Sequence, residues 1–480
     1  GGSNASINYY NKYPETKEGR DALLKAAETY EALGLLDKAA ATLILLAKSD
    51  LANQSKWRLM AADYYTVLGD YKLSKPLYEE LKSKPNSQAR SLEQLEFIAK
   101  AENNVPAREK LLREISALGI QPQASLAQLY FVEKAYTAKD FESTFNLSKK
   151  LVGSNDKGIS NYAKARARLL QAHVLDKEYR NQSLKSQVDR VHIVLQLKTE
   201  KLSKAQIAFQ SAANMGDPTV TVDALNALSD SYFHYVQAVK EMPIPKGIPP
   251  EEEAVFRGEL AKISLPMEEK SIEAKSLALK QAIQMQVRDG SIARLTSEID
   301  RMNQTVRMDT LIEFNGPESL LADEDGFYGK LPVISKVNPL SCPSGDKNWT
   351  KENLRGLIGI LNNCETLKKT DRVNTIARHL SVEFLKEGWG PYYLSLAAAN
   401  KGLLPLSIWY ADLGLRRQPN SSLLAYQKGR IQWMLGDYNA AIKSIKAASE
   451  SNPRFLEAHL ALGRIYYRDA DLKSASVHFD

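Results

Sequence analysis

A spacing of 34 residues recurs near the C-terminal end of this 480-residue chain, and it limits the possible folds more than any other feature. The spacing separates Gly402 from Gly436 (436 − 402 = 34), Pro419 from Pro453 (453 − 419 = 34) and Gly429 from Gly463 (463 − 429 = 34). Periods of about 20 to 50 residues are typical of repeat architectures, in which each unit buries its apolar face against its neighbours. The chain is therefore predicted to be a stack of similar units.

Each unit is predicted to consist of two amphipathic helices joined by a short turn. In one unit the helices are expected over Ser422 to Leu435 and over Tyr438 to Ser451. Gly436-Asp437 breaks the first helix and Asn452-Pro453 ends the second, as expected for glycine and proline at helix boundaries. The repeated unit is therefore a helix hairpin.

These hairpins resemble the tetratricopeptide repeat. That family keeps small residues where the two helices cross and a proline at the end of the unit, and the matching residues are Gly429, Ala441, Ala448 and Pro453. The next unit matches with Leu462, Gly463, Tyr466, Ala475 and Phe479. Lys428 and Gln432 depart from the Leu and Tyr that the family prefers. The resemblance implies an all-α protein, an α-solenoid of about ten to twelve helix pairs with an irregular insertion before the C-terminal block.

The same pattern occurs at the N-terminal end of the chain. One unit contains Ala27, Tyr30, Gly34 and Ala39, and the next contains Ala62, Tyr65, Gly69-Asp70-Tyr71, Tyr78 and Pro85, offset by 69 − 34 = 35 residues. Two less regular units follow, over Ala101 to Ile115 and over Leu126 to Leu151. Repeats are therefore expected at both ends.

The middle of the chain is predicted to contain longer helices of the same solenoid, because apolar residues recur there at helical spacing. These helices are expected over Tyr162 to Glu178, Val188 to Ala213, Val222 to Glu241 and Met267 to Val287. The proline-rich residues 242–250 separate the last two, and this stretch cannot be helical until after its last proline.

The proline-rich stretch carries a second resemblance. Its Met-Pro-Ile-Pro-x-Gly sequence, the acidic residues after it and Leu265-Pro266-Met267-Glu268-Glu269-Lys270 are similar to the central region of tetratricopeptide proteins from the envelope of gliding and predatory bacteria. This resemblance implies a periplasmic or envelope-associated protein. A cytoplasmic protein is the alternative.

Frequent glycine and proline residues set residues 313–350 apart as an irregular insertion, with a short strand expected at Leu331 to Val337. We therefore predict five segments. They are a tag remnant and N-terminal tail (1–16), N-terminal repeats (17–157), a long-helix segment (158–312), the insertion or linker (313–350) and C-terminal repeats of which the last is truncated (351–480).

Composition narrows the classes of function. The formal net charge of +7 is small for 480 residues, and the basic residues are interspersed with acidic ones, which does not favour nucleic acid. The longest apolar or small run, Ala39 to Ala47, is far shorter than the roughly 18 residues of a membrane span. Cys342 and Cys364 lack metal-ligand spacing, and they are either two isolated thiols or one disulfide formed in an oxidising compartment.

Motifs for phosphate binding, zinc proteolysis and a nucleophile elbow are absent from the sequence, so neither a cofactor nor an enzyme is expected. No metal is expected either, because none of the six histidines has a second His three or four residues away. Asp323-Glu324-Asp325-Gly326 begins like a calcium loop but lacks its later ligands. The alternative is an enzyme that uses the solenoid as a frame, with its site in residues 313–350.

The residues expected to bind partners lie on the first helix of each hairpin, which stacked hairpins expose along a concave surface. By resemblance to the family, the C-terminal positions are Tyr392, Asn400, Tyr426, Arg430, Trp433, Arg464, Tyr467 and Arg468. The equivalent N-terminal positions are Asp21, Leu24, Glu28 and Glu31, followed by Lys56, Leu59, Asp63 and Thr66. We call these two sets of positions the C-terminal wall and the N-terminal wall. The two walls differ in the sign of their charge.

The predicted function is a scaffold or adaptor that binds protein segments, within a bacterial envelope assembly for motility or a surface complex. A cytoplasmic adaptor or co-chaperone is the alternative. Arginines and aromatic rings on the C-terminal wall favour an acidic or C-terminal peptide, and the N-terminal wall favours a more basic partner. Because the sequence stops within a repeat, this end is expected to continue into further residues or to pack on another surface, including self-association.

Overall fold

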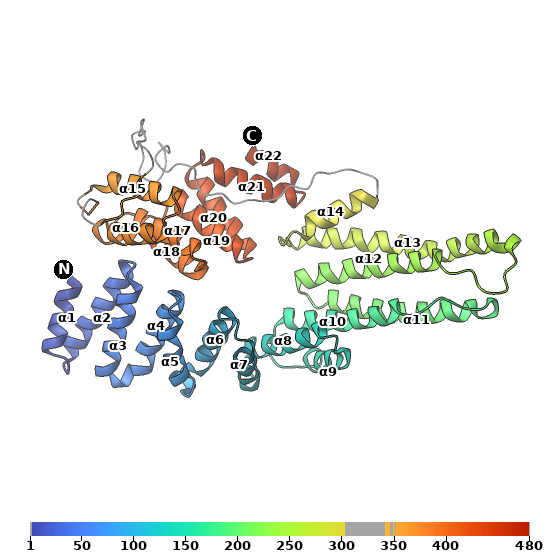
Figure 1. Ribbon diagram of the computed structural model, residues 1–480, viewed down its shortest axis with the longest axis horizontal. Coiled ribbons are helices and arrows are strands. Elements are labelled where there is room, and N and C mark those ends of the chain that lie inside the picture. Colours follow the sequence, from blue (N-terminus) through green and yellow to red (C-terminus); the bar gives the residue numbers. More distant parts are fainter. Residues whose placement is uncertain (1, 303–340, 346–348, 351, 480) are drawn as a thin grey trace. The chain divides into compact units, whose positions relative to one another are not determined.

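The computed structural model describes residues 2–302, 341–345, 349–350 and 352–479, and these residues are mostly α-helical (Figure 1). They form 22 α-helices and three short 3-10 helices, and these ranges contain no β-strand. The predicted all-α fold is confirmed, and 22 helices make 22/2 = 11 pairs, within the expected range. The strand expected at Leu331 to Val337 and the calcium-like turn at Asp323 to Gly326 lie outside the described residues.

The chain divides into two compact units. The first comprises residues 1–108, 310–467 and 471–480, and the second comprises residues 109–309 and 468–470. The first unit therefore combines repeats from both ends of the chain, whereas the second contains the long helices of the middle.

The N-terminal part of the first unit is a series of antiparallel helices in which each packs on the next. Its helices are α1 (Gly2–Lys12), α2 (Lys17–Ala32), α3 (Leu36–Ser49), α4 (Gln54–Val67), α5 (Tyr71–Leu81) and α6 (Pro85–Ala101). Residues 2–12, expected to belong to the tag and tail, form α1, and its Ile7 and Tyr10 pack against the apolar cluster of the first hairpin.

The turns between helices explain the repeated glycines. A positive φ is the left-handed region that favours glycine, which has no side chain to clash with the backbone. The repeated turn glycines have this conformation: Gly34 (φ 79°), Gly69 (φ 77°), Gly402 (φ 75°) and Gly436 (φ 80°). The period of 34 residues between Gly402 and Gly436 is therefore the distance from one hairpin turn to the next.

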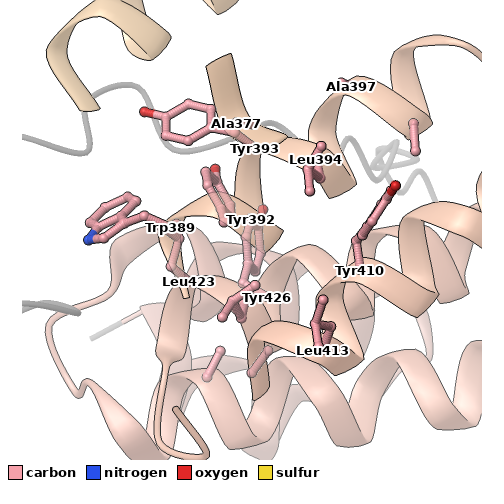
Figure 2. Close-up of a cluster of buried hydrophobic side chains, with 14 of the residues drawn as sticks. Ala377, Trp389, Tyr392, Tyr393, Leu394, Ala397, Tyr410, Leu413, Leu423 and Tyr426 are labelled. Atoms are coloured by element: carbon pink, nitrogen blue, oxygen red, sulfur yellow. The ribbon is translucent and has the colours of Figure 1, made fainter. Parts of the chain in front are cut away.

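The C-terminal part of the first unit contains four hairpins. Its helices are α15 (Leu354–Thr366), α16 (Thr370–Glu383), α17 (Trp389–Asn400), α18 (Leu404–Arg417), α19 (Ser422–Met434), α20 (Tyr438–Ser451), α21 (Leu456–Arg468) and α22 (Leu472–Phe479). Rings from α17, α18 and α19 meet in a buried apolar cluster (Figure 2). Trp389 and Tyr393 of α17 belong to this cluster and are almost fully buried.

Glycines inside the helices mark the places where two helices cross closely. A Cβ atom on Gly429 would lie 2.6 Å from Cγ1 of Ile445, and one on Gly463 would lie 2.6 Å from the ring of Phe479. Both distances are too short for an alanine without movement of the neighbour. The small residues that the sequence repeats at 34-residue spacing are therefore required by helix packing.

The second unit contains the longest helices. Helix α7 (Val105–Leu118) starts in the first unit and ends in the second. The other helices of the second unit are α8 (Gln123–Thr137), α9 (Phe141–Val152), α10 (Asn161–Arg180), α11 (Val191–Ala213), α12 (Pro218–Lys240), α13 (Glu253–Gln284) and α14 (Ser291–Met302). The helix expected to start at Met267 is instead part of α13, which continues through Pro266. Because α13 packs along α12, burial outweighs the cost of about 3 kcal/mol that an internal proline brings.

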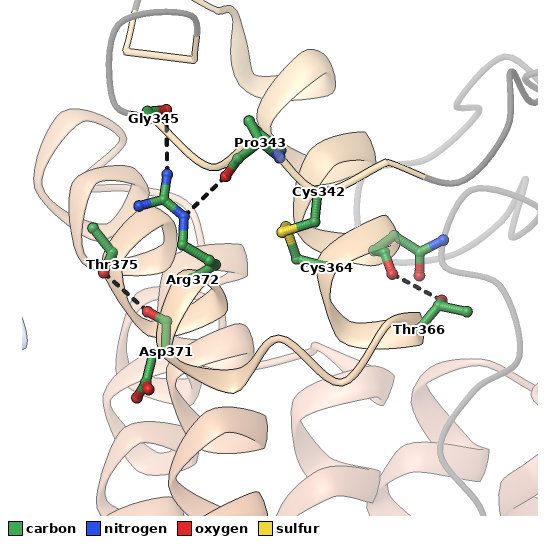
Figure 3. The surroundings of a disulfide bond; sticks show 9 residues. Cys342, Pro343, Gly345, Cys364, Thr366, Asp371, Arg372 and Thr375 are labelled. Carbon is green, nitrogen blue, oxygen red and sulfur yellow. Dashed lines mark hydrogen bonds between the residues drawn. A yellow bond between two sulfur atoms is a disulfide. The ribbon is translucent and has the colours of Figure 1, made fainter.

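Cys342 and Cys364 form a disulfide, which decides between the two alternatives that the sequence leaves open (Figure 3). Cys364 lies on α15 and is fully buried. Arg372 of α16 holds the same segment by donating hydrogen bonds to the carbonyl oxygens of Pro343, at 3.0 Å, and Gly345, at 3.3 Å. Residues 341–345 are therefore fastened to both helices of the first C-terminal hairpin.

Contacts also join the N-terminal and C-terminal parts of the first unit. Arg378 of α16 donates to both carboxylate oxygens of Asp37, at 2.8 and 2.9 Å. Arg417 of α18 donates to the carbonyl of Ala32 at 2.7 Å, and burial lowers the pKa of its guanidinium to about 10. The end of α2 and the start of α3 thus lie against α16 and α18.

Candidate functional site

A pocket of about 230 Å³ opens on the first helices of the two N-terminal hairpins. We call it the N-terminal pocket, and its lining residues are Leu24, Ala27, Glu28, Glu31, Leu43, Lys56, Trp57, Met60 and Tyr64. All but Leu43 belong to α2 and α4. The pocket therefore lies on the helices that the repeat pattern predicts to face a partner.

Helical spacing places these side chains together. Leu24, Glu28 and Glu31 follow one another at steps of four and three residues along α2, so they share one face of that helix. Trp57 is fixed in α4 because its indole N–H donates to Asp50 at 2.8 Å, and this bond lowers the pKa of the Asp50 carboxyl. The floor is thus apolar and held in place from outside the pocket.

Charged groups stand around this apolar floor. The Tyr64 hydroxyl is hydrogen-bonded to Glu31, and burial together with this carboxylate raises the pKa of the phenol. The Lys56 ammonium lies 4.5 Å from the ring centre of Trp57. Glu28 is exposed and has no ion-pair or hydrogen-bond partner among the residues that the structure describes.

Four of the eight predicted N-terminal positions line the pocket, namely Leu24, Glu28, Glu31 and Lys56. The others do not. Asp63 accepts a hydrogen bond from Tyr78 at 2.6 Å, and Thr66 is buried and donates to the carbonyl of Ala62. Sequence reasoning missed Trp57, Met60 and Tyr64, although Met60 and Tyr64 follow Lys56 at steps of four residues, which places them on the same helix face.

The eight predicted C-terminal residues are not equally accessible. Tyr392 and Tyr426 are each only 2% exposed, and both rings pack inside the apolar cluster (Figure 2). Their rings are therefore part of the interior rather than of an open wall. Burial raises the pKa of the Tyr426 hydroxyl to about 12.

The structure brings two predicted arginines near these tyrosines. Arg430 and Arg464 both lie close enough to the Tyr426 hydroxyl to oppose the rise in its pKa. Glu457 acts on the same hydroxyl in the other direction. Neither arginine forms an ion pair with Glu457 among the described residues, and Arg430 donates instead to Gln427 at 3.2 Å. Both guanidinium groups are half-buried.

Of the remaining four predicted residues, Trp433 also packs against the apolar cluster. Asn400 donates to Glu365 at 2.9 Å, and the half-buried Trp433 packs edge-on against Tyr438. Tyr467 is 39% exposed, which leaves its ring available to a partner. Arg468 belongs to the second unit, where it donates to the carbonyl of Arg288 at 2.6 Å.

The sequence contains no pair of histidines at helical spacing, but two histidines from different helices lie close together. Nδ1 of His459 and Nδ1 of His478 are 3.1 Å apart. Burial, and then the neighbouring His459, lowers the pKa of His478 below its ordinary value of 6.5. In the described part of the chain, no group of three or more His, Cys, Asp or Glu side chains is arranged to hold a metal ion. Nor is any described helix both long and apolar enough to cross a membrane.

Comparison with known proteins found no matching family model and no matching curated protein. Among solved structures, the TPR2AB domain of yeast Sti1 in complex with pHSP90 is 11% identical and covers 72% of this chain and 98% of its own, with a TM-score of 0.22. Yeast Tom70 is 10% identical and covers 98% of this chain and 91% of its own, with a TM-score of 0.24.

The TPR domain of P58(IPK) is 11% identical and covers 94% of this chain and 98% of its own, with a TM-score of 0.21. At these identities and TM-scores, none of the three transfers a site, a partner or an activity to this chain. The assignment of the fold rests instead on three observations: the period of 34 residues, the consecutive helix hairpins and the glycines at the helix crossings. The chain is an all-α protein built from tetratricopeptide-type helix hairpins.

Proposed function

We propose that this protein is a scaffold that binds segments of other proteins on the exposed sides of its first helices. The observation that carries the proposal is the N-terminal pocket, which opens on α2 and α4 at four of the predicted positions. A pocket with an apolar floor and a few charged groups at its edge suits a side chain of a bound segment. Consecutive hairpins of one repeat type present such surfaces in series.

We propose further that the protein works in an oxidising compartment, as part of a bacterial envelope assembly for motility or a surface complex. The Cys342–Cys364 disulfide supports this location, because such bonds persist outside the reducing cytosol and are rare within it. The resemblance of residues 242–270 to envelope proteins points the same way. A cytoplasmic adaptor would have to keep this bond in a reducing environment.

The two half-buried arginines of the C-terminal repeats provide the test of binding at that end. Changing Arg430 and Arg464 together to Ala is expected to weaken binding of acidic peptides by roughly 2 to 4 kcal/mol, because arginines are frequent hot spots. Arginine also holds carboxylates with two parallel hydrogen bonds. The measurement is the affinity of the intact chain for a pool of fluorescent peptides with a fixed C-terminal Asp.

The matched control changes Lys443 and Lys473 to Ala, which removes two exposed positive charges from the second helices α20 and α22. It is expected to leave peptide affinity within experimental error. If the arginine variant lowers the thermal midpoint but keeps its affinity, the arginines serve the fold, and the C-terminal assignment is wrong.

A further inference from the structure

The N-terminal pocket combines an apolar floor with two carboxylates from one helix. Glu28 and Glu31 are three residues apart on α2, so they lie on the same side of that helix. Across from them, Trp57 and Met60 of α4 supply an aromatic ring and a flexible apolar side chain. A ligand that fills this space must offer a long apolar portion and a polar end that meets two negative charges.

The electrostatic balance at the pocket favours a cation. The Glu31 carboxylate is hydrogen-bonded to Tyr64, which fixes its position, whereas Glu28 has no partner among the described residues. The basic groups facing the site are Lys56, whose ammonium already lies over Trp57, and Arg416, which acts on the Tyr64 hydroxyl from α18. Neither of these basic residues forms an ion pair with Glu28 or Glu31. The two carboxylates therefore remain available to a cationic ligand.

We propose that the N-terminal pocket binds one lysine or arginine side chain of a partner peptide. The alkyl stem lies along Trp57 and Met60, and the charged end meets the carboxylates of Glu28 and Glu31. Lysine and arginine commonly bury their stems on apolar surface while the charged end stays at a polar edge. This inference rests on the proposed function and adds the chemistry of the residue that the first two repeats select.

The test uses the intact chain and four pools of 12-residue peptides that are random except for a fixed central residue: arginine, lysine, norleucine or glutamate. Norleucine keeps the apolar stem and lacks the charge, so the comparison isolates the carboxylates. At about 0.05 M salt, the arginine and lysine pools are expected to bind roughly tenfold tighter than the norleucine pool. The preference should shrink at about 0.5 M salt, where charge interactions are screened.

Variants of the carboxylates locate the effect. Glu28→Gln with Glu31→Gln is expected to abolish the preference for basic pools, and it keeps an acceptor for the Tyr64 hydroxyl. The matched control, Glu142→Gln with Glu178→Gln, removes two exposed carboxylates that lie on α9 and α10 and should keep the preference. Lys56→Gln should strengthen binding of the basic pools, since it removes a repelling charge.

The outcomes separate this inference from the proposed function. Equal binding of all four pools, or a preference that survives in the Glu28→Gln, Glu31→Gln variant, overturns the assignment of a basic side chain while segment binding stands. Loss of the preference in the control variant as well would also overturn it, because the general charge of the chain would then be responsible. If no pool binds, the proposed function itself fails at this end.

Discussion

Replacing Gly390 with alanine is expected to lower the free energy of unfolding by about 2 to 3 kcal/mol, because the added Cβ meets backbone rather than a movable side chain. That Cβ would lie 2.6 Å from both the Cα and the N of Ser381 on α16. Ser381 also donates to the carbonyl of Leu33 at 2.8 Å, so a shift of its backbone would disturb the contact with α2 as well. Denaturant unfolding followed by circular dichroism measures the change.

Gly359→Ala is the matched control. Gly359 lies inside α15, and a Cβ on it would have no neighbour within 4 Å. Alanine is better than glycine in a helix interior by up to about 1 kcal/mol, so this variant should be slightly more stable than the parent chain. Equal effects of the two substitutions would contradict the close crossing of α16 and α17.

Removal of the disulfide is expected to cost about 3 kcal/mol of stability in the C-terminal repeats. The two cysteines are 22 residues apart, and the stabilisation expected for closing a loop of that length is of this size. The measurement compares unfolding of the oxidised protein, the same protein with a thiol reductant, and a variant with both Cys342 and Cys364 changed to Ala. The reduced protein and the variant should both unfold at lower denaturant concentration.

The reductant provides its own control, since it should leave the stability of the double variant unchanged. If reduction does not alter the unfolding of the parent protein, the bond contributes nothing to the fold.

The repeat architecture could be predicted from the sequence because its requirements are local. A turn with positive φ requires glycine, as at Gly402 and Gly436, and a close helix crossing requires a small residue, as at Gly429 and Gly463. Both requirements recur once in each hairpin, and so they appear as a period. The prediction that a separate helix starts at Met267, within α13, was wrong for the opposite reason. The local effect of Pro266 was outweighed by packing along α12, which no nearby residue reveals.

The candidate sites were only partly predictable, because which side of a first helix is open depends on the neighbouring helices. Family positions selected Glu28 and Glu31, which line the N-terminal pocket, but they also selected Tyr392 and Tyr426, whose rings are buried. Contacts between segments that are far apart in the sequence could not be predicted at all. The bond from Arg378 to Asp37 joins residues 341 positions apart, and His459 meets His478 across two helices.

The proposed function requires that the first helices bind protein segments and that the second helices do not. Site-specific photocrosslinking in the native cells tests it, with the reactive side chain placed at Leu24 of α2 or at Leu45 of α3 in otherwise identical full-length proteins. Leu24 lines the N-terminal pocket, whereas Leu45 is 38% exposed on the second helix of the same hairpin. We predict discrete adducts from position 24 that a basic peptide pool competes away, and none from position 45. Adducts from position 45 alone, or equal adducts from both positions, would contradict the proposed function.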